Sequence, residues 1–209
     1  MKAVISGDMI ASSELAPEDR KKLEQFLWEE LSELNIDESQ FSIQRGDSFQ
    51  FITLPKDALE KAIRFRCALK NLFTQQAADA RIAIGLGEIS VKGKTVASSD
   101  GTAFQRSGKT LDSLKGLGVN LAISCGIEIW DAAWQSIVGL ADEHISSWSG
   151  KQAEAILGRL DQLTYDQLGE KLHINSSAVH KRVQSAHWKS VHQALEFYAK
   201  WITHLEQVK

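Results

Sequence analysis

The sequence predicts an α+β fold in its first 125 residues and an all-α module after them. Up to Ser124, short apolar segments typical of strands alternate with segments in which apolar residues recur at helical spacing. Two Gly-Asp turns, at Gly7-Asp8 and Gly46-Asp47, end or join the predicted strands. Beyond residue 125 the pattern is helical throughout, and residues 163–183 have the spacing of a helix-turn-helix.

The first predicted elements are a strand, a helix and a hairpin. Ala3–Ser6 is an apolar segment that predicts a buried strand ending at Gly7-Asp8. Pro17 suits the first turn of a helix, and the acidic residues after it suit the positive end of the helix dipole. Phe41–Gln44 and Phe49–Leu54 then flank the second Gly-Asp turn, which predicts a hairpin.

A second helix, with apolar residues from Leu59 to Leu72, precedes a strand over Arg81–Val91. Two glycines in that strand, Gly85 and Gly87, predict a bulge or a close approach of another backbone. The order βαββαβ is that of a ferredoxin-like domain. We then expect a loop over Lys92–Gly101, a helix through Leu114 and a strand over Val119–Ser124. The predicted organisation is a domain over 1–125, a helical connector over 126–160 and a helix-turn-helix module with a C-terminal helix over 161–209.

Composition predicts a folded protein without a membrane segment. Of 209 residues, 43% are hydrophobic and 24% are charged, which are ordinary values for a chain with a real core. The short apolar run at the N-terminus is broken at Asp8, and no apolar stretch reaches 18 residues, so we expect a cytoplasmic protein. Cys67 and Cys125 lack CxxC or histidine spacing, and we expect buried thiols rather than a disulfide or a metal pair.

Chain topology brings Asp8 and Asp47 together. The first and third strands of a ferredoxin-like sheet are antiparallel neighbours, so both carboxylates fall on the same edge of the sheet. Two such acids repel unless a cation joins them, and oxygen ligands with a polyphosphate suit Mg²⁺. Backbone and hydroxyl groups of the next segment could cradle phosphate, at Ile10, Ala11, Ser12 and Ser13. The alternative is that Gly46-Asp47 is a plain tight turn and that Asp8 caps the following segment.

Four segments in order resemble the catalytic domain of class III nucleotidyl cyclases. They are Ser6-Gly-Asp-Met-Ile-Ala-Ser-Ser13, Arg45-Gly-Asp-Ser-Phe-Gln50, Arg81-Ile-Ala-Ile-Gly-Leu-Gly-Glu88 and Gly101-Thr-Ala-Phe-Gln-Arg-Ser-Gly-Lys109. The resemblance implies that Asp8 and Asp47 hold Mg²⁺ and that a nucleoside triphosphate binds beside Arg45.

The same resemblance places Gln105 and Lys109 where cyclases carry the Asn and Arg that stabilise the transition state. Both are substitutions, and lysine lacks the planar fork of arginine. Ile43 stands where cyclases carry a base-selecting lysine. These departures favour a binding site over a catalytic one.

By its Gly7-Asp8 strand, its Arg45–Gln50 hairpin and its C-terminal helix-turn-helix, the chain is identified as a member of the SatD family. That resemblance covers nearly the whole chain.

The helix-turn-helix prediction depends on caps and spacing. Thr164 and Gln167 fit a capping box, and Asn175 fits the cap of a second helix. His173 takes the turn position that is often glycine, and Gly169 allows the helices to cross closely. Inward-facing apolar residues are expected at Leu168, Leu172, Val179 and Val183. The alternative is a plain helical hairpin that supports a dimer.

The charge distribution favours DNA as the partner of this segment. The net charge is −3, yet residues 151–209 hold eight Lys and Arg against six Asp and Glu. Between Lys171 and Leu195 there is no acidic residue, and four histidines join the basic side chains. Residues expected to face double-stranded DNA are Ser176, Ser177, His180, Lys181 and Gln184, with Arg182 and Lys189 near phosphates. Because such proteins bind paired half-sites, we also expect a homodimer.

An apolar stripe from Trp188 to Leu205 is expected to be core or a dimer seam. Three functions therefore stay open at this point. The protein is a DNA-binding regulator whose first domain senses a nucleotide or holds a dimer, a Mg²⁺-dependent nucleotide-processing enzyme, or an inactive scaffold.

Overall fold

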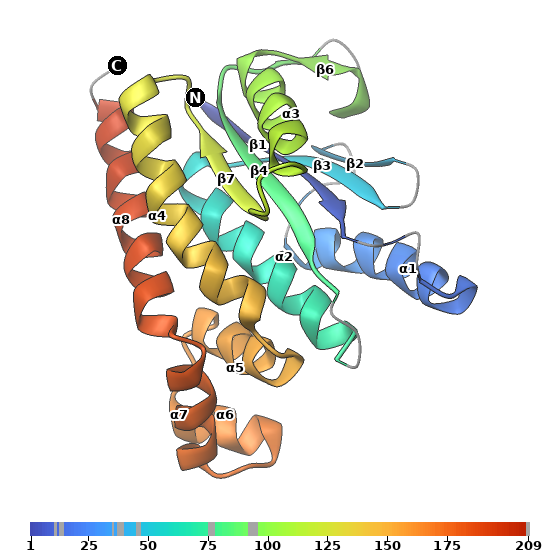
Figure 1. Cartoon of the computed structure of the whole chain (residues 1–209), viewed down its shortest axis with the longest axis vertical. Coiled ribbons are helices and arrows are strands. Elements are labelled where there is room, and N and C mark those ends of the chain that lie inside the picture. The colour runs from blue at the N-terminus through green and yellow to red at the C-terminus, as the bar shows by residue number, and fades with distance from the viewer. Residues whose placement is uncertain are drawn as a thin grey trace.

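The computed structural model describes residues 1–10, 12, 15–34, 36, 40–44, 47–74, 78–91 and 96–207. It is an α+β structure built on a five-stranded mixed sheet in the order β2-β3-β1-β4-β7 (Figure 1). The strands are β1 (Lys2–Met9), β2 (Phe41–Gln44), β3 (Ser48–Thr53), β4 (Ala80–Gly87) and β7 (Leu121–Ser124).

The central strand β1 determines how the sheet positions the Gly-Asp turns. It pairs antiparallel with β3, with Asp8 opposite Ser48, and antiparallel with β4, with Asp8 opposite Arg81. The predicted antiparallel pairing of the first and third strands is therefore confirmed. The last strand, β7, runs parallel to β4 at the edge of the sheet.

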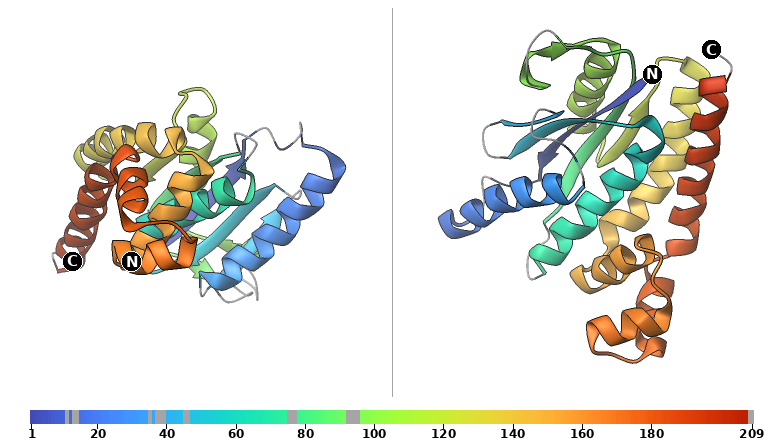
Figure 2. Two further views of the ribbon diagram at one scale, coloured as in Figure 1. Left: turned by 90° about the horizontal axis from the view of Figure 1, so that it is seen from below. Right: turned by 180° about the vertical axis from the view of Figure 1, so that it is seen from behind.

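Helices cover the two faces of the sheet unequally. Two long helices, α1 (Pro17–Glu33) and α2 (Ala58–Leu72), lie on one face, and α3 (Thr102–Leu114) lies on the other (Figures 1 and 2). On the first face the rings of Phe49 and Phe65 pack with centroids 4.3 Å apart. Burial of such aromatic surface stabilises this layer.

Gly85 and Gly87 allow α3 to pack directly on β4, as their position in the strand predicts. A Cβ at Gly85 would overlap the carbonyl oxygen of Ala103 and lie 2.5 Å from the backbone nitrogen of Ser107. A Cβ at Gly87 would lie 2.8 Å from the backbone nitrogen of Ala103. Glycine is therefore required here by close approach of a backbone.

The prediction of one strand over Arg81–Val91 followed by a loop is wrong in detail. The strand β4 ends at Gly87, and Ser90–Val91 forms a separate strand, β5, that pairs with β6 (Ser99–Asp100). A 3₁₀ helix, η4 (Val96–Ser98), precedes β6. The break is explained by Gly101, whose φ of 131° brings the start of α3 against the carbonyl oxygen of Glu88. The chain therefore turns away from the sheet after Gly87.

The C-terminal half is made of five helices. They are α4 (Glu128–Ser147), α5 (Gly150–Leu160), α6 (Tyr165–Leu172), α7 (Ser176–Ser185) and α8 (Trp188–Gln207). Figure 1 shows α4 and α8 side by side along the body, with α6 and α7 at the far end. No helix in the described part of the chain is long and apolar enough to span a membrane.

The stripe on α8 is core rather than an exposed seam. Its Tyr198 and Ile202 are each 1% exposed, and Tyr198 donates a hydrogen bond of 2.7 Å to the carbonyl of Pro55 in the 3₁₀ helix η3 (Pro55–Asp57). On α4, Trp134 is fully buried against Tyr198 and Trp201. One apolar core cluster therefore runs from the sheet to the last helix.

A buried ion network joins α2 to α4. Arg66, which is fully buried, donates to both carboxylate oxygens of Asp79 at 2.7 Å and also to Asp142. Lys70 lies 2.9 Å from the same Asp79 carboxylate. Burial alone would lower the pKa of Arg66, but the two carboxylates outweigh it and raise that pKa. The network sits beside β1, because the carbonyl of Asp79 accepts from the nitrogen of Ile10.

Candidate functional site

Asp8 and Asp47 lie at the same end of neighbouring strands, as the topology predicts. The nitrogen of Met9 donates to the carbonyl of Asp47 at 3.0 Å, which ties the end of β1 to the start of β3. The hydroxyl of Ser12 donates to Asp47 Oδ2 at 2.7 Å, and the hydroxyl of Ser48 donates to Asp47 Oδ1 at 3.3 Å. Ser12, which follows β1 in the sequence, therefore contacts the Asp47 carboxylate.

Two basic residues that sequence reasoning missed hold Asp8. Arg81 Nη1 lies 3.2 Å from both carboxylate oxygens of Asp8, and Lys115 Nζ lies 3.6 Å from Oδ2. The Asp8 side chain is 14% exposed, so this charge is largely removed from water. Arg81 is 73 positions away in sequence, and only the register of β1 against β4 places it opposite Asp8.

Asp8 and Asp47 alone supply too few oxygen ligands for Mg²⁺, and a phosphate would have to supply others. Magnesium is commonly held by one or two carboxylates, with phosphates and waters completing its octahedron. In the described part of the chain no group of three His, Cys, Asp or Glu could hold a metal ion. Arg81 and Lys115 compete with a metal for Asp8, and the same two cations could contact a phosphate.

A chain of hydroxyl and amide groups connects this end of the sheet to α3. Gln50 Nε2 donates to Ser6 Oγ at 2.8 Å, and Ser6 Oγ lies 2.9 Å from Ser107 Oγ. Ser107 is fully buried and donates onward to the carbonyl of Phe104 at 3.1 Å. These buried hydroxyls are satisfied, so they fix the position of α3 over β1.

Gln105 and Lys109 are exposed on α3. Within one chain, Gln105 lies far from Asp8. Gln105 Nε2 lies 3.5 Å from Asp100, beside the N-terminal end of α3. Lys115, just past the other end of α3, lies 3.6 Å from the Asp8 carboxylate. Ten residues of helix separate the two positions, which corresponds to about 15 Å along the axis.

The remaining predicted nucleotide residues are only partly described. Ile10 is half-buried, and Ala11, Ser13 and Arg45 lie outside the described residues. Ile43, the residue at the base-selecting position, packs against the main core opposite Phe49. That side chain therefore belongs to the face of the sheet that α1 and α2 cover.

The helix pair α6 and α7 has the expected caps and turn. Thr164 and Gln167 form a reciprocal capping box, and Asn175 accepts from the nitrogen of Ala178 at 2.7 Å. His173 is left-handed, with φ 53° and ψ 42°, and a Cβ at Gly169 would lie 2.8 Å from the carbonyl oxygen of Ile174. Apolar contacts between the helices are buried at Leu168, Val179 and Val183, and Leu172 is half-buried.

Most residues predicted to contact DNA are exposed. These are Ser177, His180, Lys181 and Gln184 on α7, and Lys189 at the start of α8. Ser176 and Arg182 are half-buried, and Arg182 Nη1 lies 3.2 Å from Glu154 Oε2 on α5. Arg182 is therefore held by an ion pair within the chain, whereas Lys181 and Lys189 extend into solvent.

A groove beside α7 adds residues that sequence reasoning did not select. It has a volume of about 600 Å³ and includes Arg159, His180, His187, Lys189 and His192. The Arg159 guanidinium lies 5.0 Å from the ring centroid of Tyr165, which packs edge-on against His180. Arg159 is on α5 and His192 on α8, so helix spacing within α7 could not reveal the groove.

Comparison with known proteins finds a matching family and two similar solved structures. The model of the SatD family matches residues 2–196. Two solved structures of a bacterial light-regulated adenylyl cyclase are similar, each with a TM-score of 0.40, at 13% and 16% identity. The similarity covers 59% and 61% of this chain and 42% and 44% of theirs, so the chain spans less than half of their length. None of the curated proteins compared with the chain matches it. The family match extends over more than half of the sequence, and the chain belongs to the SatD family.

Proposed function

We propose that this SatD-family protein is a DNA-binding regulator that reads the major groove with α7. The observation that carries the proposal is an exposed surface of basic and polar side chains, formed by Ser177, His180, Lys181, Gln184 and Lys189. Hydroxyl, imidazole and amide groups can hydrogen-bond base edges, and the two lysines can neutralise phosphates.

Rigid attachment of the helix pair supports this function. Trp148 Nε1, at the end of α4, donates to the carbonyl of Ala186 at 2.7 Å, which anchors the end of α7. On the other side, a Cβ at Gly158 would overlap the side chain of Leu168, so α5 and α6 are in close contact. A recognition helix held in this way keeps its orientation when it meets a groove, which limits the entropy lost on binding.

The proposal includes a homodimer. Helix-turn-helix proteins read two half-sites with two copies, about one turn of DNA apart. Sedimentation at several protein concentrations would measure the assembly.

Reversing the charge of Lys181 and Lys189 together is expected to weaken DNA binding at least about tenfold, because two phosphate contacts become repulsive. The measurement is fluorescence anisotropy with a labelled duplex of mixed sequence at several salt concentrations. The slope of log affinity against log salt should fall by about two.

The matched control reverses the charges of Lys21 and Lys200, which are exposed on α1 and α8, away from this surface. That variant has the same net charge as the test variant and should retain nearly full affinity. Arg182 is left unchanged, because its ion pair with Glu154 would confuse a loss of binding with a loss of structure. Equal weakening in both double variants would contradict the proposal, since it would reflect net charge alone.

A second candidate function is nucleotide binding at Asp8 and Asp47. The two carboxylates at one end of the sheet, with Ser12 folded onto Asp47, are the observation that favours it. Mg²⁺ would be held by these carboxylates and would supply charge neutralisation for a polyphosphate. Arg81 and Lys115 would then orient the phosphates. A nucleotide sensor and an enzyme would both bind the nucleotide, but only the enzyme would convert it to a product. An inactive scaffold would not bind it.

Mg²⁺ with ATP or GTP is expected to raise the melting temperature of the wild type and not that of Asp47→Asn. A ligand at 100 times its dissociation constant stabilises the folded state by about 2.7 kcal/mol. The matched control is Asp112→Asn, an exposed carboxylate on α3. Chromatography of each nucleotide after incubation separates the outcomes. A new product indicates an enzyme, stabilisation without product indicates a sensor, and neither indicates a scaffold.

A further inference from the structure

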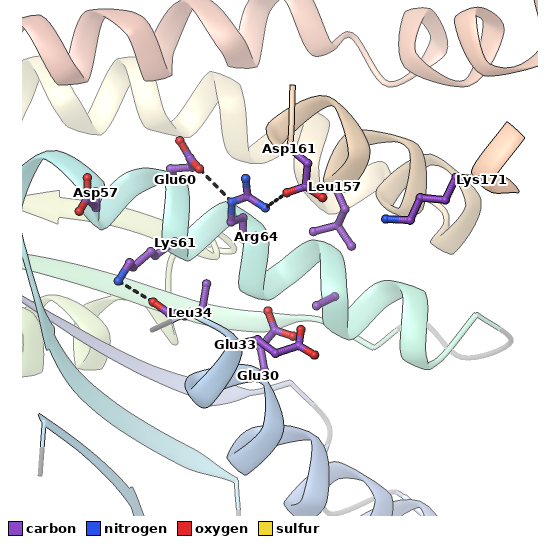
Figure 3. A pocket seen from close by; sticks show the side chains of 11 residues that line it. Glu30, Glu33, Leu34, Asp57, Glu60, Lys61, Arg64, Leu157, Asp161 and Lys171 are labelled. Carbon is purple, nitrogen blue, oxygen red and sulfur yellow. Dashed lines mark hydrogen bonds and ion pairs between the residues drawn. The ribbon is translucent and has the colours of Figure 1, made fainter. Parts of the chain in front are cut away.

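A pocket between the first domain and the C-terminal helices lies outside both sites described above. It has a volume of about 600 Å³ and is lined by residues of α1, α2, α5 and α6. Figure 3 shows its carboxylates, with Glu30 and Glu33 at one end and Glu60 and Asp161 around Arg64. The helices that form it belong to segments far apart in the sequence, so the tertiary fold creates the pocket.

The carboxylates outnumber the cations, and most of the cations are engaged. Arg64 binds Glu60 at 2.8 Å and Asp161 at 2.6 Å, which leaves its charge balanced. Lys61 donates to the carbonyl of Leu34 at 2.8 Å and thereby caps the end of α1. Lys171 reaches the pocket from α6 and is exposed at its rim.

Glu30 is the unusual group in this pocket. It is only 8% exposed, and among the described residues its carboxylate has no hydrogen-bond or ion-pair partner. Ionising a buried carboxyl without a partner carries a large desolvation cost, so Glu30 favours its neutral form unless a cation binds beside it. The pocket is thus more than a group of surface acids, because it contains a largely buried carboxyl that pairs with none of the described residues.

We propose that this pocket binds a primary aliphatic amine, with the ammonium group between Glu30 and Glu33. An ammonium donates three hydrogen bonds and suits two carboxylates better than a bare monovalent ion does. Leu34, Ala68 and Leu157 supply apolar surface along the pocket for the methylene groups. The pocket shares no lining residue with the candidate nucleotide site or with the residues predicted to contact DNA, and it lies where α2 packs against α5.

Titration of Glu30 gives the binding a distinct pH dependence. Burial, followed by repulsion from Glu33, raises the pKa of Glu30 to about 8, while Arg64 acts in the opposite direction. Asp57 and Glu60 on α2 and Asp161 on α5 add negative charge, and Lys61 on α2 and Lys171 on α6 add positive charge. Because a neutral carboxyl attracts an ammonium weakly, amine binding should release a proton at neutral pH.

The test is isothermal titration calorimetry with n-butylammonium chloride, compared with sodium chloride, butanol and sodium butyrate. Saturable binding is expected for the amine alone, since the alcohol lacks the charge and the butyrate repels the site. Affinity should rise about tenfold from pH 7 to pH 9, as Glu30 becomes ionised while the amine, with a pKa near 10.4, stays charged.

Two variants make the result specific. Glu30→Gln should weaken amine binding about tenfold or more at pH 9 and remove the pH dependence. Glutamine resembles the protonated carboxyl, so this variant should fold like the wild type. Glu29→Gln changes an exposed neighbour on the same helix and should leave affinity unchanged. Absence of saturable heat with the amine, equal heat with sodium chloride, or full affinity in Glu30→Gln would overturn the proposal.

Discussion

Replacing Arg66 with methionine is expected to lower the free energy of unfolding by about 3–5 kcal/mol. Methionine fills a similar volume, but it leaves the carboxylates of Asp79 and Asp142 buried without their guanidinium partner. Lys70 still compensates Asp79, whereas Asp142 keeps only neutral donors, among them the backbone nitrogen of Asn120 at 2.7 Å. Urea unfolding followed by circular dichroism measures the change.

The control is Arg64→Met, two positions away on the same helix. Arg64 also forms two ion pairs, with Glu60 and Asp161, but these carboxylates are exposed. Surface ion pairs contribute about 0–1 kcal/mol, so this variant should lose little stability. Comparable losses in the two variants would contradict the view that burial makes the Arg66 network decisive.

The Arg66 network also predicts how stability depends on pH. Burial alone would raise the pKa of Asp79, but Arg66 and Lys70 outweigh it and lower that pKa below its ordinary value. Because the folded-state pKa is lowered, the stabilisation is fully present above the unfolded pKa of about 3.9 and is lost as the pH falls through the folded value. The difference in unfolding free energy between wild type and Arg66→Met should therefore shrink below about pH 4.

Replacing Gly85 with valine is expected to lower the free energy of unfolding by about 3 kcal/mol, as overpacking of a tight contact does. The atoms that a Cβ would meet are the backbone of Ala103 and Ser107, which cannot rotate away as a flexible side chain can. Displacement of α3 would also break the hydrogen bond between Ser107 and Ser6. Thermal unfolding and amide hydrogen exchange in α3 would measure both effects.

Gly108→Val is the matched control on α3. A Cβ at Gly108 would meet no atom within 4 Å, so the substitution enters open space. Valine is a slightly better helix former than glycine, and the expected change is within about 0.5 kcal/mol. A large loss at Gly108 with little loss at Gly85 would show that α3 does not require glycine on β4 for its position.

The candidate nucleotide site shows how far sequence reasoning extends. Strand order follows from the βαββαβ pattern, and it correctly predicted that Asp8 and Asp47 lie at one end of adjacent strands. The ion pair of Asp8 with Arg81 and Lys115 could not be predicted in the same way. It depends on the residue-by-residue register of β1 against β4 and on where α3 ends, and neither has a local signal.

The C-terminal helices likewise contain some features that the sequence predicts and others that it does not. Caps and the left-handed turn depend on residues within a few positions of one another, so Thr164, His173 and Asn175 were predictable. The ion pair of Arg182 with Glu154 joins two helices across 28 positions of sequence, and residues of four helices line the groove that contains Arg159 and His192. Helical spacing alone placed Arg182 on the surface predicted to face DNA, but its side chain is half-buried.

The sequence by itself determined the α+β class, the positions of the main strands and helices, the caps and the glycine contact on β4. Each follows from backbone preferences or from apolar spacing within one segment. Only the tertiary structure decided the partners of Asp8, the burial of Arg66 and the isolation of Glu30. Their environments depend on segments that meet across the fold, and the electrostatic energy of a charge is determined by those neighbours and by its distance from water.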